Sequence, residues 1–472
     1  MQSAAGPKLL VTIACHGERN LEFLKRLIRT YRQMAMPVDV VVVSDRLKDL
    51  GPEIEVVVGA PTSNPWSLPF AHKAILADRV DRYDLFAYSE DDMLVTEANV
   101  RAFLEVTPSL GANEIAGFLR YEIDTDGQHS FPDAHGSYHW IPESVRRRGK
   151  LTVAEFSCEH AAFYLLTRDQ LERAIASGGF LQGPREGRYD MLCTAATDPY
   201  TVCGFRKVVC ISRLDSFVIH HLSNRYAGRL GMPRSLLEAQ VKALAAISRG
   251  EHPASSLCRV ECDLSGGEWS KRYDETAREE VIELIPREAT KVLYVGSGWG
   301  NIDEVLVSRG HSLTVLPLDS VVGATAEDRG SQVLYGTLDE SLRNLDGKCF
   351  DAVLCTSLLH LLPSPDKILG QLCRLVGEGG VLVLSGPNFA ALKLWIKRIL
   401  RRGDLARISD PEKGGVHMLG PRFVERHATR HGLEMDRVSW LGRSSHSRLD
   451  SALGRYGAGS WTLRATRRSK AQ

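Results

Sequence analysis

The sequence predicts an α/β protein of two domains, each built around a doubly wound, mainly parallel sheet. In each half, short apolar runs rich in valine and isoleucine alternate with segments whose leucines recur at helical spacing, which is typical of parallel sheets covered by helices. The length of 472 residues exceeds what one hydrophobic core usually serves. One strand in each half ends in residues suited to a nucleotide, acidic in the first half and glycine-rich in the second.

The first half opens with short buried strands and one amphipathic helix. We expect strands at residues 9–16, 39–44 and 54–58, and a helix at residues 20–34. Ligands of such sheets bind beyond the carboxyl ends of the strands. Asp45 follows the second strand, and Glu90-Asp91-Asp92 follows a further apolar strand that begins near Tyr83. Both positions are therefore expected at the binding edge of the sheet.

Three consecutive carboxylates, Glu90, Asp91 and Asp92, repel one another unless a cation or a basic partner offsets their charge. A divalent metal ion held there by oxygen ligands and by two phosphates would neutralise a leaving diphosphate. A solvated turn is the competing interpretation, because acidic clusters are common on protein surfaces. Spacing alone does not separate the two.

The first half resembles the GT-A family of nucleotide-sugar glycosyltransferases over residues 8–230. The resemblance lies in VTIACH at 11–16, DLF at 84–86 and EDD at 90–92, where the family has DXD. It implies that Asp45 contacts the base or ribose of a nucleotide-sugar donor, and that Asp91 and Asp92 bind Mg²⁺ or Mn²⁺. A late histidine often completes the metal shell in this family, and we assign that role to His220, with His221 as the alternative. Adjacent residues of a strand point to opposite faces, so at most one histidine ligates, and a purely structural role for both is the competing interpretation.

An inverting transfer needs a carboxylate to deprotonate the acceptor hydroxyl. The polar, turn-rich stretch 184–190 supplies two candidates, Glu186 first and Asp190 second. A retaining transfer needs no such base, and the sequence does not decide between the two outcomes.

The domain boundary is expected near residue 250. An alanine- and leucine-rich helix at 235–249 is followed by irregular sequence containing His-Pro, Ser-Ser and Gly-Gly pairs, which is typical of a linker. We therefore expect four parts: a first domain at 1–250, a linker with a lead-in helix at 251–290, a second domain at 291–450, and a basic tail at 451–472, whose Arg-rich segment 464–470 is expected to be disordered.

The second half begins with a strand that runs directly into alternating glycines. Gly296, Gly298 and Gly300 lie in the sequence VGSGWG, between an apolar strand and a predicted helix at 302–308. A glycine fingerprint alone is weak evidence, because such turns also join strands to helices without binding a ligand. The βαβ pattern then continues through residues 312–318, 333–336, 350–355 and 379–388.

This series resembles the class I S-adenosylmethionine-dependent methyltransferases over residues 270–445, through VGSGWG, FDAVLCTSLLHLLPSP and GEGGVLVLSGPN in that order. The resemblance implies a Rossmann-like fold whose glycines let the methionyl part of the cofactor approach the backbone without an intervening Cβ. It also implies that Asp339 or a neighbour lies near the adenine and that residues 358–360 line the cofactor or the acceptor. His360 is a candidate general base toward a sugar hydroxyl, and a packed histidine is the competing interpretation.

Two departures from that family concern the cofactor. Members usually end the second strand with an acid that binds both ribose hydroxyls, but Pro317 stands at that position. Asp319, two residues on and on the same strand face, is the expected substitute. The sequence also has LLHLL where a glutamate–histidine pair is common. The domain is therefore either an active methyltransferase or one that kept the fold and lost the cofactor.

Composition limits the partners and the location. The formal net charge of +1 gives no overall attraction to nucleic acid or membranes. Ten cysteines without a close CxxC pair indicate reduced thiols rather than a zinc site or a disulfide framework. Residues 1–7 lack the basic-then-apolar pattern of a signal peptide, and no apolar run reaches the roughly 18 residues of a membrane span. We therefore expect a cytoplasmic protein.

One local pattern indicates contact with the inner face of a membrane. Residues Leu392 to Arg402, LKLWIKRILRR, place Leu392, Trp395, Ile396 and Ile399 on one helix face with five basic residues around it. Such a helix can lie on an anionic lipid surface. A helix packed on its domain with its lysines in solvent is the competing interpretation.

The sequence thus predicts a bifunctional enzyme of surface polysaccharide or glycolipid assembly. The first domain would transfer a sugar from a nucleotide donor to a glycan or lipid-linked glycan, and the second would methylate a hydroxyl with S-adenosylmethionine. Fusion would keep the product of one step close to the other site. Two alternatives remain: a glycosyltransferase with a non-catalytic methyltransferase-like scaffold, and a methyltransferase whose first half merely binds a nucleotide.

Overall fold

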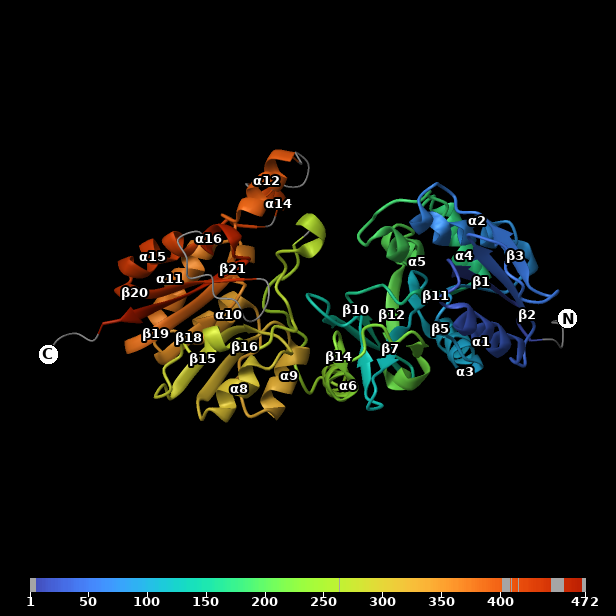
Figure 1. Ribbon diagram of the computed structural model, residues 1–472. Helices are drawn as coiled ribbons and strands as arrows, with labels where there is room; N and C mark the ends of the chain where they lie inside the picture. Colours follow the sequence, from blue (N-terminus) through green and yellow to red (C-terminus); the bar gives the residue numbers. More distant parts are fainter. Residues whose placement is uncertain are drawn as a thin grey trace. The chain divides into compact units, whose positions relative to one another are not determined.

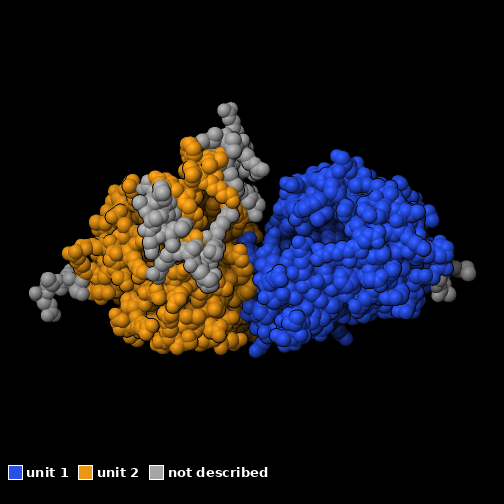
Figure 2. All heavy atoms as spheres, in the orientation of Figure 1, with its two compact units in different colours: residues 1–248 blue, residues 249–472 orange. Residues whose placement is uncertain are grey.

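The computed structural model describes residues 6–262, 264–400, 408, 410–414, 416–442 and 454–468. The chain divides into two compact units, Met1–Ser248 and Arg249–Gln472 (Figures 1 and 2). The sequence placed this division near residue 250. Each unit is described by itself.

The main sheet of the first unit has five strands in the order β11-β4-β1-β2-β3. These are β1 (Leu9–Cys15), β2 (Val38–Ser44), β3 (Glu55–Val58), β4 (Leu85–Glu90) and β11 (Phe163–Thr167). Strands β1 to β4 pair with one another in parallel, whereas β11 is antiparallel to β4. Every residue of β1 is buried, because a central strand covered by helices is apolar on both faces.

Six helices and two smaller sheets complete this unit. The helices are α1 (Leu21–Arg32), α2 (Ala71–Ala77), α3 (Glu97–Val106), α4 (Arg168–Ala176), α5 (Met191–Thr201) and α6 (Arg234–Ser248). One small sheet, in the order β14-β8-β7-β13-β5, contains β5 (Met93–Leu94), β7 (Leu119–Ile123), β8 (His129–Phe131), β13 (Val218–His221) and β14 (Met232–Pro233). The other, in the order β6-β12-β10-β9, contains β6 (Glu114–Ala116), β9 (Trp140–Arg148), β10 (Leu151–Phe156) and β12 (Arg206–Cys210).

The prediction of one doubly wound sheet therefore describes only β1 to β4. The unit is a mixed α/β structure with several sheets, because later strands turn back antiparallel or pair away from the main sheet. The acidic triplet lies where the chain leaves β4 and enters β5 of a second sheet.

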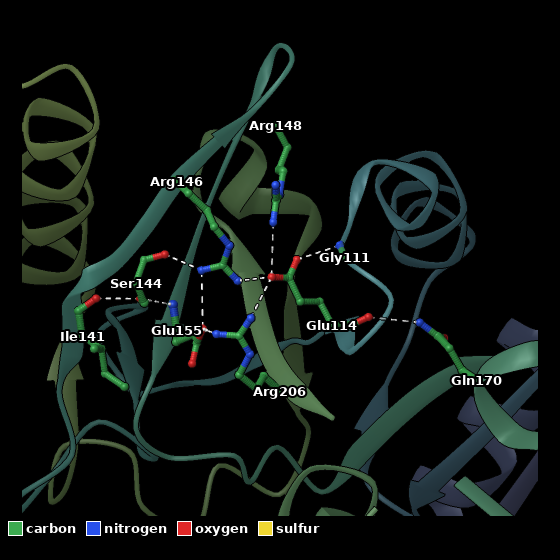
Figure 3. Close-up of polar contacts among 9 residues, drawn as sticks. All are labelled: Gly111, Glu114, Ile141, Ser144, Arg146, Arg148, Glu155, Gln170 and Arg206. Carbon is green, nitrogen blue, oxygen red and sulfur yellow. Dashed lines mark hydrogen bonds and ion pairs between the residues drawn. The ribbon is translucent and has the colours of Figure 1, made fainter. Parts of the chain in front are cut away.

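In the sheet β6-β12-β10-β9, a buried glutamate on β6 pairs with basic side chains of β9 and β12 (Figure 3). Glu114 on β6 is only 2% exposed. Its carboxylate pairs with Arg146, with Arg206 Nη2 at 3.2 Å and with Arg148 Nη2 at 3.5 Å. Glu155 on β10 also pairs with Arg146 and Arg206. Burial of Glu114 is tolerated because basic groups from β9 and β12 neutralise it.

The second unit contains a seven-stranded sheet in the order β17-β16-β15-β18-β19-β21-β20. Its strands are β15 (Lys291–Ser297), β16 (Ser312–Pro317), β17 (Gln332–Val333), β18 (Phe350–Cys355), β19 (Val376–Pro387), β20 (Leu433–Leu441) and β21 (Ser460–Arg467). All neighbours are parallel except around β21, which is antiparallel to both β19 and β20. The strand order reverses between β15 and β18, where ligands of such sheets bind.

Helices cover both faces of this sheet (Figure 1). The described helices of this unit are α7 (Glu279–Ile282), α8 (Ile302–Ser308), α9 (Ser320–Asp328), α10 (Leu338–Arg343), α11 (Pro365–Leu375), α12 (Leu392–Leu400), α14 (Pro411–Gly414), α15 (Pro421–Arg430) and α16 (Gly454–Gly457), of which α12 and α14 project from the sheet. Within the described ranges, no helix has the length and apolar character needed to cross a membrane.

The structure corrects the expectation of a disordered basic tail. Ser460–Arg467 forms β21, which pairs on both sides inside the sheet. Trp461, Leu463 and Ala465 are buried, and they alternate with polar or basic residues. This alternation with a period of two is typical of a strand. We did not predict the strand because the arginines of the segment indicated a basic tail. Residues 469–472 lie outside the described part of the chain.

We expect Glu114→Gln to lower the free energy of unfolding by about 3 kcal/mol, because it removes the charge that pairs the arginines of β9 and β12. Urea unfolding of the full chain measures the change. Arg148→Gln is the matched control and should cost less than about 1 kcal/mol, because Arg148 is partly exposed and its contact with Glu114 is long. Equal effects of the two substitutions would contradict the central role of Glu114.

Candidate functional site

In the first unit, the predicted nucleotide and metal residues gather at the carboxyl edge of the main sheet. Asp45 follows β2, Asp91 and Asp92 follow β4, and the loop after β1 lies between them. The Gly17 amide donates to Asp45 Oδ1 at 2.8 Å. The Asn20 side chain donates to Asp91 Oδ1 at 2.8 Å and to Asp92 Oδ2 at 3.4 Å. Asn20 carries no signal in the sequence that would have singled it out.

His221, rather than His220, faces the acidic cluster. The Nε2 atom of His221 lies 3.1 Å from Asp92 Oδ2, and its Nδ1 contacts Glu122. The ring of His220 points to the opposite face of β13 and stacks on Tyr121, with 4.9 Å between ring centroids. The alternation of side chains along a strand thus separates the two histidines, and the structure places His221 beside the acids where we had assigned His220.

Burial controls protonation in this cluster. Asp91 and Asp92 are 7% and 5% exposed. Burial raises the pKa of Glu90 to about 8 and that of Asp91 to about 6. Burial also acts to raise the pKa of Asp92, but the hydrogen bond and charge of His221 outweigh it and hold that pKa below its ordinary value. Asp92 is therefore the member of the triplet that keeps its negative charge to the lowest pH.

The pKa of His221 is shifted upward, opposite to that of Asp92. Burial acts to lower the pKa of His221, but hydrogen bonds to Asp92 and Glu122 outweigh it and raise the pKa to about 9. At neutral pH, His221 and Asp92 therefore form an ion pair. A metal ion bound here would replace the proton on His221, because a metal-binding imidazole must be neutral.

Among the residues that the structure describes, no three His, Cys, Asp or Glu side chains are grouped so that they could hold a metal ion by themselves. Magnesium is usually bound by one or two carboxylates together with substrate phosphates, rather than by a cage of protein ligands. The cluster around Asp92 therefore suits a cation only when phosphate oxygens complete its shell.

The two candidate bases differ in position. Glu186 is exposed. Asp190 is the N-cap of α5 and accepts a hydrogen bond from the Cys193 amide at 2.9 Å. The pKa of the Cys193 thiol is raised mainly by burial and then by the negative charges of Glu90 and Asp190. Glu90 of the acidic triplet and Asp190 therefore both act on the Cys193 thiol.

In the second unit, Gly296 lies near the end of β15, whereas Gly298 and Gly300 lie in the turn from β15 to α8 and contact the preceding segment of the chain. A Cβ on Gly298 would overlap the carbonyl oxygen of Tyr273, and one on Gly300 would overlap that of Glu275. Gly296 has a left-handed backbone, with φ of 82°. Gly298 and Gly300 are thus required by the close approach of the preceding segment, whereas the sequence analysis reserved this space for a cofactor.

We call residues 255–275 the strap, because they cross the carboxyl edge of the sheet; residue 263 is outside the described part. Hydrogen bonds join the strap to the ends of three adjacent strands and to α10. They run from Leu257 N to Leu318 O at 2.8 Å, from Leu338 N to Leu257 O at 2.9 Å, from Gly300 N to Tyr273 O at 3.1 Å and from Lys271 Nζ to Thr356 O at 2.8 Å. The strap therefore covers the edge at which the strand order reverses.

Asp319, the expected substitute for the missing ribose-binding acid at Pro317, is engaged by the protein. Its Oδ1 accepts the amides of Val321 and Val322 at 2.8 and 3.0 Å, which makes it the N-cap of α9. The Tyr273 side chain lies beside Asp319, and burial followed by this carboxylate raises the pKa of Tyr273. The carboxylate is buried beneath the strap.

His360 lies inside the domain. Its ring is 3% exposed, and Nε2 lies 2.7 Å from the carbonyl oxygen of Trp269 in the strap, to which it donates when it carries the proton. Burial lowers the pKa of His360 to about 4. This arrangement favours the packed histidine over the general base.

Asp339 lines a cavity of about 880 Å³ beside the strap. Leu257 and Arg259 of the strap line it together with Leu361 and Lys367. Lys367 Nζ lies 3.0 Å from Asp339 Oδ1. A cavity of this volume is within the range of small-molecule sites. The residue expected near an adenine thus borders a space of suitable size.

The chain is similar to known methyltransferases in three comparisons. Residues 293–384 match a family described as a methyltransferase domain. The chain is 25% identical over 190 residues to the ubiquinone biosynthesis O-methyltransferase of Coxiella burnetii (strain Dugway 5J108-111), covering 35% of this chain and 81% of that protein. It is 32% identical over 114 residues to the protein of the same name from Dechloromonas aromatica (strain RCB), covering 23% and 49%. One similar solved structure is that of an S-adenosylmethionine-dependent methyltransferase from Thermotoga maritima, described as a possible histamine N-methyltransferase. Its sequence is 14% identical to this chain, and the match covers 40% of this chain and 86% of that chain with a TM-score of 0.30.

Proposed function

We propose that the second unit, which contains a class I methyltransferase region, transfers a methyl group from S-adenosylmethionine to an oxygen atom of its acceptor. The observation that carries the proposal is the match of residues 293–384 to a methyltransferase domain, which spans the glycine turn and the strands around the reversal point of the sheet. Oxygen as the methyl acceptor is supported by the Coxiella relative, whose name states O-methylation.

The residues at the glycine turn do not fit this cofactor while the strap lies as described. Gly298 and Gly300 contact the strap backbone, and Asp319 accepts the amides of Val321 and Val322. Methyl transfer therefore requires the strap to move. The alternative of a non-catalytic, methyltransferase-like scaffold is favoured by the same contacts and by Pro317 at the end of β16.

For the first unit, we propose transfer of a sugar from a nucleotide donor to a glycan or lipid-linked glycan. Mg²⁺ or Mn²⁺ would bind at Asp92, with Asp91 beside it and the diphosphate as a shared ligand. The gathering of Asp45, Asn20 and the two aspartates at one sheet edge supports this role. Asp190 is the better placed base if the transfer inverts configuration.

We also propose that α12 contacts an anionic lipid surface. Leu392, Trp395 and Ile396 are 52%, 59% and 43% exposed, whereas Leu394 is buried against the domain. Figure 1 shows α12 and α14 projecting from the sheet. The exposed apolar side chains and the adjacent Lys393 match the apolar and anionic layers of a lipid surface. Arg401 and Arg402 of the predicted helix lie outside the described residues.

The methyltransferase proposal predicts saturable binding of S-adenosylhomocysteine to the full chain, with one molecule per chain. Isothermal titration calorimetry measures this binding without requiring a known acceptor. Circular dichroism verifies that the wild type and variants with a weakened strap are folded. If none of these folded proteins binds the ligand, the scaffold alternative is favoured.

The glycosyltransferase proposal predicts that Mn²⁺ increases the affinity for a nucleoside diphosphate such as UDP or GDP, because the ion joins carboxylate and phosphate oxygens. Asp92→Asn should lower this metal-dependent affinity at least about tenfold. Asp81→Asn, at an exposed aspartate away from the sheet edge, is the control and should leave the affinity unchanged. Affinity that is independent of the metal, or unaffected by Asp92→Asn, would contradict the proposal.

The lipid proposal predicts co-sedimentation with vesicles rich in phosphatidylglycerol and weak co-sedimentation with pure phosphatidylcholine. Trp395→Ala should weaken the binding about thirtyfold, because one large apolar side chain contributes about 2 kcal/mol when buried. Trp66→Ala is the matched control, since Trp66 is 50% exposed in the first unit. If both variants lose the same amount of vesicle binding, or if the protein self-associates instead of binding vesicles, the lipid proposal for α12 is contradicted.

A further inference from the structure

We propose that the second unit binds a phosphate monoester of a small organic molecule in a basic cavity at the amino edge of its sheet. This amino-edge cavity has a volume of about 600 Å³. It lies where β18 and β19 begin and where the antiparallel strand β21 ends, and α10 and α11 border it. Its described lining shares no residue with the glycine turn or the strap, so the inference does not depend on methyl transfer.

The amino-edge cavity carries an excess of positive charge. Four basic side chains and two carboxylates line it: Arg343, Lys348, Arg374, Arg467, Asp346 and Glu378. Arg343 and Arg467 donate to backbone carbonyl oxygens, and within the described part of the chain neither Lys348 nor Arg374 forms an ion pair. A phosphate monoester carries a charge of about −1.5 to −2 at neutral pH, which matches the excess of two positive charges.

The backbone holds Arg467 in place. Its Nε donates to Val376 O at 2.9 Å and its Nη2 donates to Cys373 O at 2.7 Å, at the end of α11. These bonds offset the partial negative charge of the helix terminus, which would otherwise repel an anion. They also fix the plane of the guanidinium. Its Nη1, which bonds to no described residue, is therefore available to a phosphate oxygen.

Arg374 and His431 lie against the same position of α11. A Cβ on Gly370 would be 3.0 Å from His431 Nε2 and 3.9 Å from Arg374 Nη1, so the glycine leaves room for both side chains. Burial lowers the pKa of His431, and the charges of Arg374 and Arg467 lower it further. The two guanidiniums therefore act on one part of the cavity wall, one from α11 and the other from β21. Such a pair suits the several oxygens of a phosphate.

The size and the apolar part of the cavity indicate an organic ligand rather than a free phosphate ion. A volume of about 600 Å³ is within the range of small-molecule sites. Leu342, Leu375 and Val376 line the cavity beside the basic residues, and all three are buried. They offer an apolar surface to the organic part of a phosphate monoester, while the arginines bind its phosphate.

Cys349 provides a local reporter for the test. It lines the cavity, and among the ten cysteines, all of which lie within the described ranges, only Cys349 is exposed. Phenyl phosphate should slow the alkylation of Cys349 by iodoacetamide in the full chain, because the bound ester shields the thiol. Phenol at the same concentration should not slow it, and inorganic phosphate should protect less. Mass spectrometry of the peptide that contains Cys349 measures the rate, so binding elsewhere does not contribute.

Arg374→Gln should raise the concentration of phenyl phosphate needed for half protection at least about tenfold, because it removes charge-assisted hydrogen bonds to the phosphate. Arg426→Gln is the matched control and should leave this concentration unchanged. Arg426 is also an exposed arginine on a helix of the second unit, α15, but it does not line the cavity. Circular dichroism verifies that both variants are folded.

Protection by phenyl phosphate that only Arg374→Gln weakens would support the site. The proposal is overturned if millimolar phenyl phosphate gives no protection, if phenol protects equally, or if both variants lose protection to the same extent. Equal protection by inorganic phosphate would overturn the assignment of the apolar wall to an organic part. The comparison of phenyl phosphate with phenol on the wild type decides the question even if Arg374→Gln folds poorly.

Discussion

The contact between the strap and the glycine turn after β15 determines what the second unit can bind. Two backbones approach there as closely as the absence of a Cβ allows. That approach brings the Tyr273 hydroxyl to Asp319 and the Lys271 ammonium to the end of β18. The glycines therefore serve the packing of the chain itself.

The same physical constraint operates at the acidic edge of the first unit. Charged groups taken from water need partners, and in both units the chain supplies those partners itself. Asp92 is paired with His221, and Lys271 is paired with Glu275. A ligand at the acidic edge would have to exchange the pair of Asp92 and His221 for a cation and its phosphates.

Much of the architecture was predictable, because buried strands and covering helices leave local patterns. The apolar runs that end at Cys15, Ser44 and Glu90 form strands of the first unit, and the glycine turn follows β15 as expected. Strand β21 was missed, because its arginines outweighed the alternation of Trp461, Leu463 and Ala465. The additional sheets of the first unit were missed because pairing partners far apart along the chain leave no periodic signal.

By itself, the sequence determined the α/β class, the two units, and the carboxylates and glycines at strand ends, since each of these depends on the order of neighbouring residues. Only the tertiary structure decided that His221 rather than His220 faces the acids, that Asn20 reaches Asp91 across 71 positions, and that Lys271 reaches Thr356 across 85. The physical reason is that strand register and loop packing bring distant residues together, and no local periodicity records which of them will meet.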